Sequence, residues 1–397
     1  MNKSISYLNL QKEKSIKFNF NLQKIVNYIF IFFCFIPFLF PNPIVNTNIQ
    51  PYASILAIVV ILLNYKVKID MRRNYFSFIL PLFTFLVAMV LMFISGVNIQ
   101  VIRGVYNYYG MFIIPIATII VLNKIGELPE KFIKLCILLW FFVGSVQFFI
   151  YRGFATSLIS GVRWSFDYRG VIGLASEPSF YGIACFYFLN LITRFKTRKH
   201  IYMILTLIMG IFYAQSIIGI IFIASFYIIF LIDSTTTSHG LKLWVFTILL
   251  VFIGAYIFRN FMNTTRIYDI VQNAINNGIN SILLDESASN RLDSIINAFR
   301  EFAKNNFLPY GFDHRIGSAI GGVLVELGVF GIPAIIYLAK SLGMTFKRKL
   351  SFILYFIIVI LLFLNNTQIG NPLLLFVIGV NIWDNQKKSL NYEIIKI

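Results

Sequence analysis

Long apolar runs recur along the whole chain, separated by shorter polar or basic segments. Each run has about 15–22 residues, close to the ~20 that cross a bilayer as an α-helix. The predicted spans are residues 25–41, 51–65, 75–96, 105–122, 132–151, 179–193, 200–214, 217–232, 242–258, 318–338, 351–365 and 371–383. The pattern predicts an all-α polytopic membrane protein with twelve transmembrane helices, forming a single integral membrane domain over residues 1–397.

The apolar stretch 200–232 admits either one long helix or two short ones. At ~1.5 Å per residue a single helix would be close to 50 Å long, whereas the hydrocarbon core is ~30 Å thick. The polar pair Gln215-Ser216, followed by Gly219, offers a place for a hairpin. We therefore predict two helices.

The charge pattern predicts the orientation of these spans. With the N-terminus in the cytoplasm, 24 of the 34 lysine and arginine residues fall in cytoplasmic segments, as the positive-inside rule requires. Both termini are then cytoplasmic. The loops account for the net charge of +18, so we expect no nucleic-acid partner.

Arginine dominates the segments predicted to lie outside, where only one of ten basic residues is lysine. A topology signal would not distinguish the two cations. The planar guanidinium binds phosphate through two parallel hydrogen bonds, so we expect phosphate recognition on the outer face. The ten residues are Arg103, Arg152, Arg163, Arg169, Arg259, Arg266, Arg291, Arg300, Lys304 and Arg315.

Two predicted outer loops are long enough to hold a site, residues 152–178 and 259–317. The second is expected to be a large helical extracytoplasmic loop. Its segment TRIYDIVQNAINNG predicts an amphipathic helix that stops at Gly278. The segment NRLDSIINAFREFAKNN predicts another, which Asn290 would cap. Such helices suit contact with membrane lipid or with a lipid-attached substrate.

Motifs for metal-bridged, nucleotide-dependent or serine-hydrolase chemistry are missing from the sequence, so we expect no cofactor and no metal. His314 is the only histidine predicted to lie outside, and it is either a proton acceptor or an incidental loop residue. Glu177 precedes Pro178, so it is either catalytic or a residue of the helix N-terminus. Glu326 falls within an apolar span and must face protein or a polar cavity.

Three motifs together give a family resemblance. They are RG-x2-GLASEPS-x2-G, SNRLDSI with LPYGF, and GGVLVELGVFGIP. The chain resembles the Wzy-type O-antigen polymerases and the related O-antigen ligases, over about residues 160–340 by motif and over the whole chain by span layout. The matching positions are Arg169, Arg291, Gly311, Leu324, Glu326, Gly328 and Gly331.

The resemblance implies a glycosyltransferase that joins undecaprenyl-diphosphate-linked oligosaccharide repeat units outside the bacterial inner membrane, making O-antigen or capsule. It also implies that Arg169 and Arg291 are catalytic. These arginines would stabilise the departing diphosphate, and Glu177 or His314 would accept the proton of the acceptor hydroxyl. We expect the glycines near Arg169 to let the backbone and the substrate approach closely. Further substrate-binding candidates are Arg103, Arg163, Arg266, Arg315, Tyr310 and Gly311.

Two other functions stay open at this point. Ligases commonly carry His-Asn near the start of the tenth span, where this chain reads IGSAIGG, so a polymerase is favoured over a ligase. A lipid-linked oligosaccharide flippase also has about twelve spans, but it is built from two similar halves, and no such repeat is visible here. A polymerase could also have a chain-length regulator protein as its partner.

Overall fold

The computed structural model describes residues 22–40, 48–67, 69, 75–163, 170–234, 266–278, 286–313, 316–365 and 367–396. These residues are mostly helical, and within them the only β-type pairing is an isolated antiparallel bridge between Leu39 and Ile159. The expectation of an all-α protein is therefore confirmed for the described residues.

Most of the described helices lie where the apolar and amphipathic segments predict them. They are Leu22–Phe35, α2 (Tyr52–Leu63), α3 (Tyr75–Ser95), α4 (Ile99–Ile125), α5 (Glu130–Phe149), α6 (Pro178–Ile192), α7 (Lys199–Ile208) with the π-helical η2 (Met209–Tyr213), α8 (Ile217–Ser234), α10 (Arg266–Asn277), α11 (Glu286–Lys304), α12 (Ala319–Leu327), η4 (Gly328–Gly331), α13 (Ile332–Gly343), α14 (Lys349–Phe363) and α15 (Pro372–Lys396). A short 3-10 turn, η1, covers Thr156–Leu158. The predicted span 242–258 lies outside the described residues.

By length and composition, five of the described helical segments could cross a membrane, and five further apolar helices have 10–17 residues. The five long segments are Tyr75–Ser95, Ile99–Ile125, Glu130–Phe149, Ile217–Ser234 and Ala319–Gly343. The predicted break in residues 200–232 is confirmed, because η2 ends at Tyr213 and α8 begins at Ile217. Gln215 adopts a positive φ of 43° within this break.

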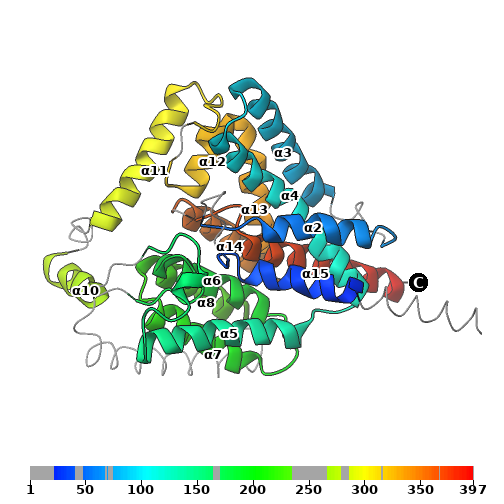
Figure 1. Cartoon of the computed structure of the whole chain (residues 1–397), viewed down its shortest axis with the longest axis horizontal. Coiled ribbons are helices and arrows are strands. Elements are labelled where there is room, and N and C mark those ends of the chain that lie inside the picture. Colours follow the sequence, from blue (N-terminus) through cyan, green and yellow to red (C-terminus); the bar gives the residue numbers. More distant parts are fainter. Residues whose placement is uncertain are drawn as a thin grey trace, which may run out of the picture.

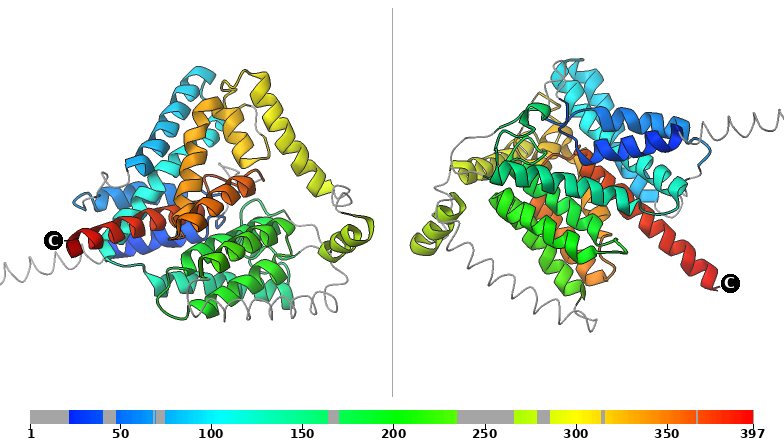
Figure 2. Two further views of the ribbon diagram at one scale, coloured as in Figure 1. Left: turned by 180° about the vertical axis from the view of Figure 1, so that it is seen from behind. Right: turned by 60° about the horizontal axis from the view of Figure 1, so that its bottom comes forward.

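Helix α6 lies at the centre of the bundle, and its side chains from Tyr181 to Ile192 are all buried. It packs against α7, α8 and α15, and α15 packs in turn against α4. Figures 1 and 2 show α5 to α8 grouped on one side of the molecule, with α3, α4, α11 and α12 on the other. The close crossing of α6 and α8 depends on Gly182, because a Cβ there would lie 2.6 Å from the Cα of Gly219.

Helices α10 and α11 lie along the edge of the molecule, and α10 is at the opposite edge from the C-terminal end of α15 (Figure 1). The predicted end of α10 is confirmed, since Gly278 follows Asn277 with a φ of 82°. The predicted cap at Asn290 is wrong, because α11 begins four residues earlier at Glu286. Glu286 and Ala288 are good helix formers, and a glutamate in the first turn favours the helix N-terminus, so the helix extends past Asn290.

The predicted span 318–338 is not one continuous helix. Residues 319–327 form α12, which is only ~13.5 Å long, and the chain then turns at Gly328 with φ 60° and ψ −146°. A Cβ on Gly331 would lie 2.8 Å from the backbone oxygen of Val323. Residues eight apart in a straight helix are ~12 Å apart, so the chain folds back here. We call residues 319–331 the α12–η4 unit.

Candidate functional site

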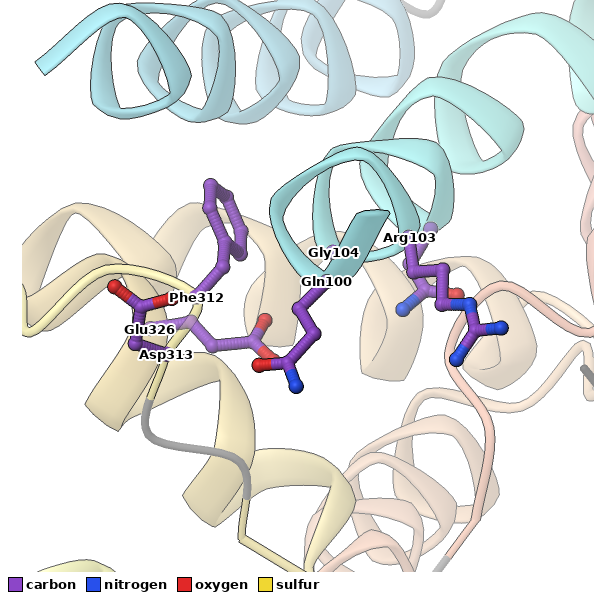
Figure 3. Close-up of a pocket in the computed structure, with 7 residues that line it drawn as sticks. Gln100, Arg103, Gly104, Phe312, Asp313 and Glu326 are labelled. Atoms are coloured by element: carbon purple, nitrogen blue, oxygen red, sulfur yellow. The ribbon is translucent and has the colours of Figure 1, made fainter. Parts of the chain in front are cut away.

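A cavity of about 290 Å³ lies between α4, the α12–η4 unit and the turn that precedes it (Figure 3). The part of its lining that the structure describes carries one guanidinium, two carboxylates and two carboxamides, so it is strongly polar within a largely apolar protein. The lining residues are Gln100, Arg103, Gly104, Asn107, Phe312, Asp313 and Glu326.

Helix α4 supplies one wall of the cavity through a single helical face. Its lining residues follow the spacing i, i+3, i+4, i+7, which places them in one row along a helix. The Asn98 side chain caps this helix by accepting a hydrogen bond from the backbone N–H of Val101 at 2.8 Å. The cap fixes where the helix begins and hence which residues face the cavity. The lining residues of this wall are Gln100, Arg103, Gly104 and Asn107.

The turn LPYGF is attached to the end of α12 by two backbone hydrogen bonds. The N–H of Tyr310 donates to the oxygen of Val325 at 2.9 Å, and the N–H of Gly311 donates to the oxygen of Glu326 at 3.1 Å. These carbonyls belong to the last turn of α12, where no intrahelical donor remains for them. Gly311 adopts a φ of 80°, which suits glycine. The turn therefore closes the helix end and carries Phe312 and Asp313 to the cavity.

Phe312 fits into the cavity wall because Gly104 has no side chain. A Cβ at Gly104 would lie only 2.1 Å from the Phe312 ring. The buried ring thus holds the turn against α4, and Asp313, the next residue, is exposed at the cavity.

Glu326 lines the cavity, as its position in an apolar segment predicts. Its Oε2 accepts a hydrogen bond of 2.6 Å from the hydroxyl of Tyr108, one turn beyond Gly104 on α4. Tyr108 is fully buried, so its hydroxyl has a fixed position. In Figure 3 the side chains of Glu326 and Gln100 point toward one another across the cavity.

The structure places three substrate-binding candidates at or beside the cavity. Arg103 lines it, and Tyr310 and Gly311 form the attached turn. The Tyr310 hydroxyl donates to Oε2 of Glu301 at 3.1 Å. Desolvation and the Glu301 carboxylate raise the pKa of Tyr310. The Tyr310 side chain therefore joins the LPYGF turn to α11.

The remaining arginine and histidine candidates are not in the described lining. Arg291 lies half-buried on α11, Arg163 is exposed in the loop before α6, and Arg266 is the first residue of α10. Arg169, His314 and Arg315 lie outside the described residues. His314 and Arg315 follow Asp313 directly in the sequence.

Glu177 occupies the N-cap position of α6, without a side-chain bond to the helix backbone. Its Oε1 instead accepts a hydrogen bond from the Ser179 hydroxyl at 2.6 Å. We call residues 170–182 the α6 entry. The glycines of the α6 entry bring parts of the chain together: a Cβ on Gly170 would lie 2.1 Å from the oxygen of Ala214, and Gly182 contacts α8. The expected close approach of the backbone is confirmed at these glycines, and the close approach of a substrate stays a prediction.

Gln100, Asn107 and Tyr108 were not among the candidates predicted from the sequence. The signal was present, because two amides and an arginine recur at helical spacing in a segment that continues into an apolar run. The predicted start of the fourth span at residue 105 is six residues later than the start of α4, so Gln100 and Arg103 were not placed on one helical face with Asn107.

Among the described residues, no group of three or more His, Cys, Asp or Glu side chains could hold a metal ion. Metal independence therefore stays a prediction. Comparison of the chain with family models, with curated proteins and with solved structures finds no match in any of the three.

Proposed function

We propose that this protein polymerises undecaprenyl-diphosphate-linked oligosaccharide repeat units on the outer side of the bacterial inner membrane. One observation carries the proposal. The two segments that resemble the polymerase family, LPYGF and VELGVFG, are joined by backbone hydrogen bonds, and together with α4 they enclose one polar cavity. A polar cavity with a few convergent charged groups is the usual form of a small-molecule or catalytic site.

The proposal includes twelve spans with both termini in the cytoplasm. Loops assigned to the inner side contact one another: the Lys387 Nζ donates to the oxygen of Gly126 at 2.9 Å, and Lys196 pairs with Glu127 at 3.2 Å. Span ends assigned to the outer side do the same, since the Ser318 hydroxyl donates to the oxygen of Leu364 at 2.6 Å. These contacts support the alternation of the spans.

The span 242–258 belongs to this arrangement. Arg348 donates to the oxygen of Ile232 at 3.0 Å, so both residues lie at the same side of the bundle. The chain between them must then cross the membrane an even number of times. We assign one crossing to the apolar segment 319–343, which turns at Gly328, and the other to the apolar run 242–258, which lies outside the described residues. Helices α10 and α11 then lie on the outer side, where a lipid-linked glycan would be bound.

In the proposed reaction the acceptor hydroxyl oxygen bonds to the anomeric carbon of the donor chain. The bond from that carbon to the diphosphate oxygen breaks, and its electron pair leaves with undecaprenyl diphosphate. Arg169 and Arg291 bind the diphosphate and stabilise the charge that develops on its oxygen, without a metal. The hydroxyl proton passes to a general base of the protein.

Lipid-linked intermediates in a strain lacking the gene test this function. A polymerase mutant accumulates single repeat units on undecaprenyl diphosphate at the outer face, and we expect this result. Long chains that remain on the lipid would identify a ligase, and single units that face the cytoplasm would identify a flippase. Polymer of normal length would contradict the proposal.

A further inference from the structure

We infer that the cavity between α4 and the α12–η4 unit binds the acceptor sugar, and that Glu326 accepts the proton of its hydroxyl. The inference rests on the proposed function and adds to it the place of the acceptor and the general base. It stands on the cavity lining and on the hydrogen bond between Tyr108 and Glu326.

The size and lining of the cavity suit a sugar. Its volume of about 290 Å³ is at the lower end of ligand pockets, roughly 300–1,000 Å³, so it has room for a sugar unit but not for a lipid-linked chain. The carboxamides of Gln100 and Asn107 offer donors and acceptors, and the carboxylates of Asp313 and Glu326 offer acceptors. Sugar hydroxyls need both kinds of partner.

The charge of the lining distinguishes the acceptor from the diphosphate of the donor. Among the described lining residues, Arg103 contributes one positive charge, whereas Asp313 and Glu326 contribute two negative charges. A diphosphate placed here would be repelled by two carboxylates in a partly enclosed site, where Coulomb interactions are stronger than in water. A neutral hydroxyl group is attracted by the same carboxylates. The diphosphate is thus bound elsewhere, by Arg169 and Arg291.

Glu326 is the carboxylate whose position is fixed. It projects from α12, a helix held on one side by the LPYGF turn and on the other by α11, where Ala298 is fully buried against Gly321. The Tyr108 hydroxyl holds Oε2 at 2.6 Å. Asp313, by contrast, is exposed on a turn. A general base must lie within hydrogen-bond reach of the proton that it accepts, so a carboxylate held by a hydrogen bond is favoured over one exposed on a turn.

In the step itself, the carboxylate of Glu326 takes the proton of the acceptor hydroxyl as the oxygen forms its bond to the anomeric carbon. The donor diphosphate leaves with the electron pair of the broken bond. The protonated carboxyl then returns the proton to water before the next transfer. Tyr108 is a positioning residue, because it holds the carboxylate and does not touch the sugar.

The test uses purified full-length protein in nanodiscs with two substrates. The donor is a labelled lipid-linked repeat unit whose own acceptor hydroxyl has been removed, so that it can only donate. The acceptor is an unmodified lipid-linked unit at varied concentration, and the initial rate of single transfers is measured. We expect Glu326→Gln to lower kcat by about 100–10,000-fold with little change in the acceptor KM.

Two further variants separate binding from positioning. Gln100→Ala should raise the acceptor KM with kcat unchanged, because the Gln100 amide contributes only to binding. Tyr108→Phe should lower kcat without raising the acceptor KM, a split that a general loss of folded protein would not give. Asp269→Asn removes an exposed carboxylate on α10 and serves as the matched control, for which we expect wild-type kinetics.

The failure of the inference differs from the failure of the proposed function. If the wild-type protein transfers and Glu326→Gln transfers at the same rate, the inference is overturned and the proposed function stands. If the wild-type protein itself does not transfer, both are overturned. If the Glu326→Gln protein unfolds below the assay temperature, the kinetics of Gln100→Ala provide the test instead. An unchanged acceptor KM for Gln100→Ala would then overturn the inference.

Discussion

The α6 entry and the α12–η4 unit carry similar residues, but the structure uses them differently. Each combines a glutamate with glycines near the end of a buried helix. In both, the glycines allow backbone segments to approach closely. Glu177 of the α6 entry bonds to a serine two residues away, whereas Glu326 of the α12–η4 unit lines a polar cavity together with residues from α4. The glycines of the two segments therefore indicate close packing only. The polar groups around each carboxylate indicate which of the two segments belongs to the candidate site.

The largest expected effect on activity concerns two arginines, one near the α6 entry and one near the α12–η4 unit. Arg169 directly precedes the α6 entry, and Arg291 lies on α11, which packs against α12. If they bind diphosphate bidentately, Arg169→Lys and Arg291→Lys should each slow polymerisation by about 100–1000-fold at normal protein level, since lysine cannot reproduce the fork. The yield and length of lipid-linked polymer provide the measurement. Near-normal chains from one lysine variant would remove that arginine from the site.

Gly328 should show the largest effect on stability. Its φ of 60° and ψ of −146° lie close to a region that only glycine occupies readily, and a Cβ would lie 2.6 Å from the backbone of Leu308 and Pro309. Gly328→Ala should therefore cost about 1–3 kcal/mol from backbone strain and a similar amount from overpacking. Gly278→Ala is the matched control, because Gly278 also has a positive φ but open space around it. Thermal unfolding in detergent should show a clearly smaller decrease in melting temperature for Gly278→Ala than for Gly328→Ala.

Gly182 tests the packing role of the α6 entry. Alanine there would push against the Cα of Gly219 on α8 and should cost about 1–3 kcal/mol. Gly110 is also a buried helical glycine, but the nearest atoms to its Cβ position are 3.6 Å away. Gly110→Ala should leave the melting temperature equal or higher, since alanine is the better helix former. Equal melting temperatures for the two variants would argue against a close α6–α8 contact.

The smallest expected effect is a loss of protein stability at alkaline pH, caused by Tyr310 in the LPYGF turn. The pKa of Tyr310 is raised by desolvation and by Glu301, so the folded state favours the neutral phenol. This contribution to stability is present below the ordinary tyrosine pKa of about 10 and is lost as the pH rises through the higher folded value. Tyr310→Phe should remove that dependence. Melting temperatures at several pH values from neutral to strongly alkaline would reveal it, and identical pH profiles would contradict the predicted role of the contact.

The sequence predicted the helices well and the site only in part. A long apolar run is a local pattern that indicates a buried helix. Most described helices therefore begin or end within a few residues of the predicted spans. The turn at Gly328 escaped prediction because the segment stays apolar on both sides of it. The hydrogen bond between Tyr108 and Glu326 joins residues 218 apart in the sequence, and no local pattern reports such a contact. Glu326 could be selected because a carboxylate in an apolar run requires a polar environment. Arg103, Tyr310 and Gly311 were also predicted from the sequence, and they lie at or beside the cavity.

A side-by-side assay of Glu326→Gln and Glu177→Gln tests the central claim most directly. Each variant replaces one carboxylate by a neutral amide of the same shape, in the α12–η4 unit and in the α6 entry respectively. Polymer yield from lipid-linked repeat units and the melting temperature should be measured on the same purified samples. We predict that Glu326→Gln keeps its melting temperature and makes no polymer, while Glu177→Gln still makes polymer. Loss of polymer in Glu177→Gln alone, with Glu326→Gln active, would contradict the account and move the proton acceptor to the α6 entry.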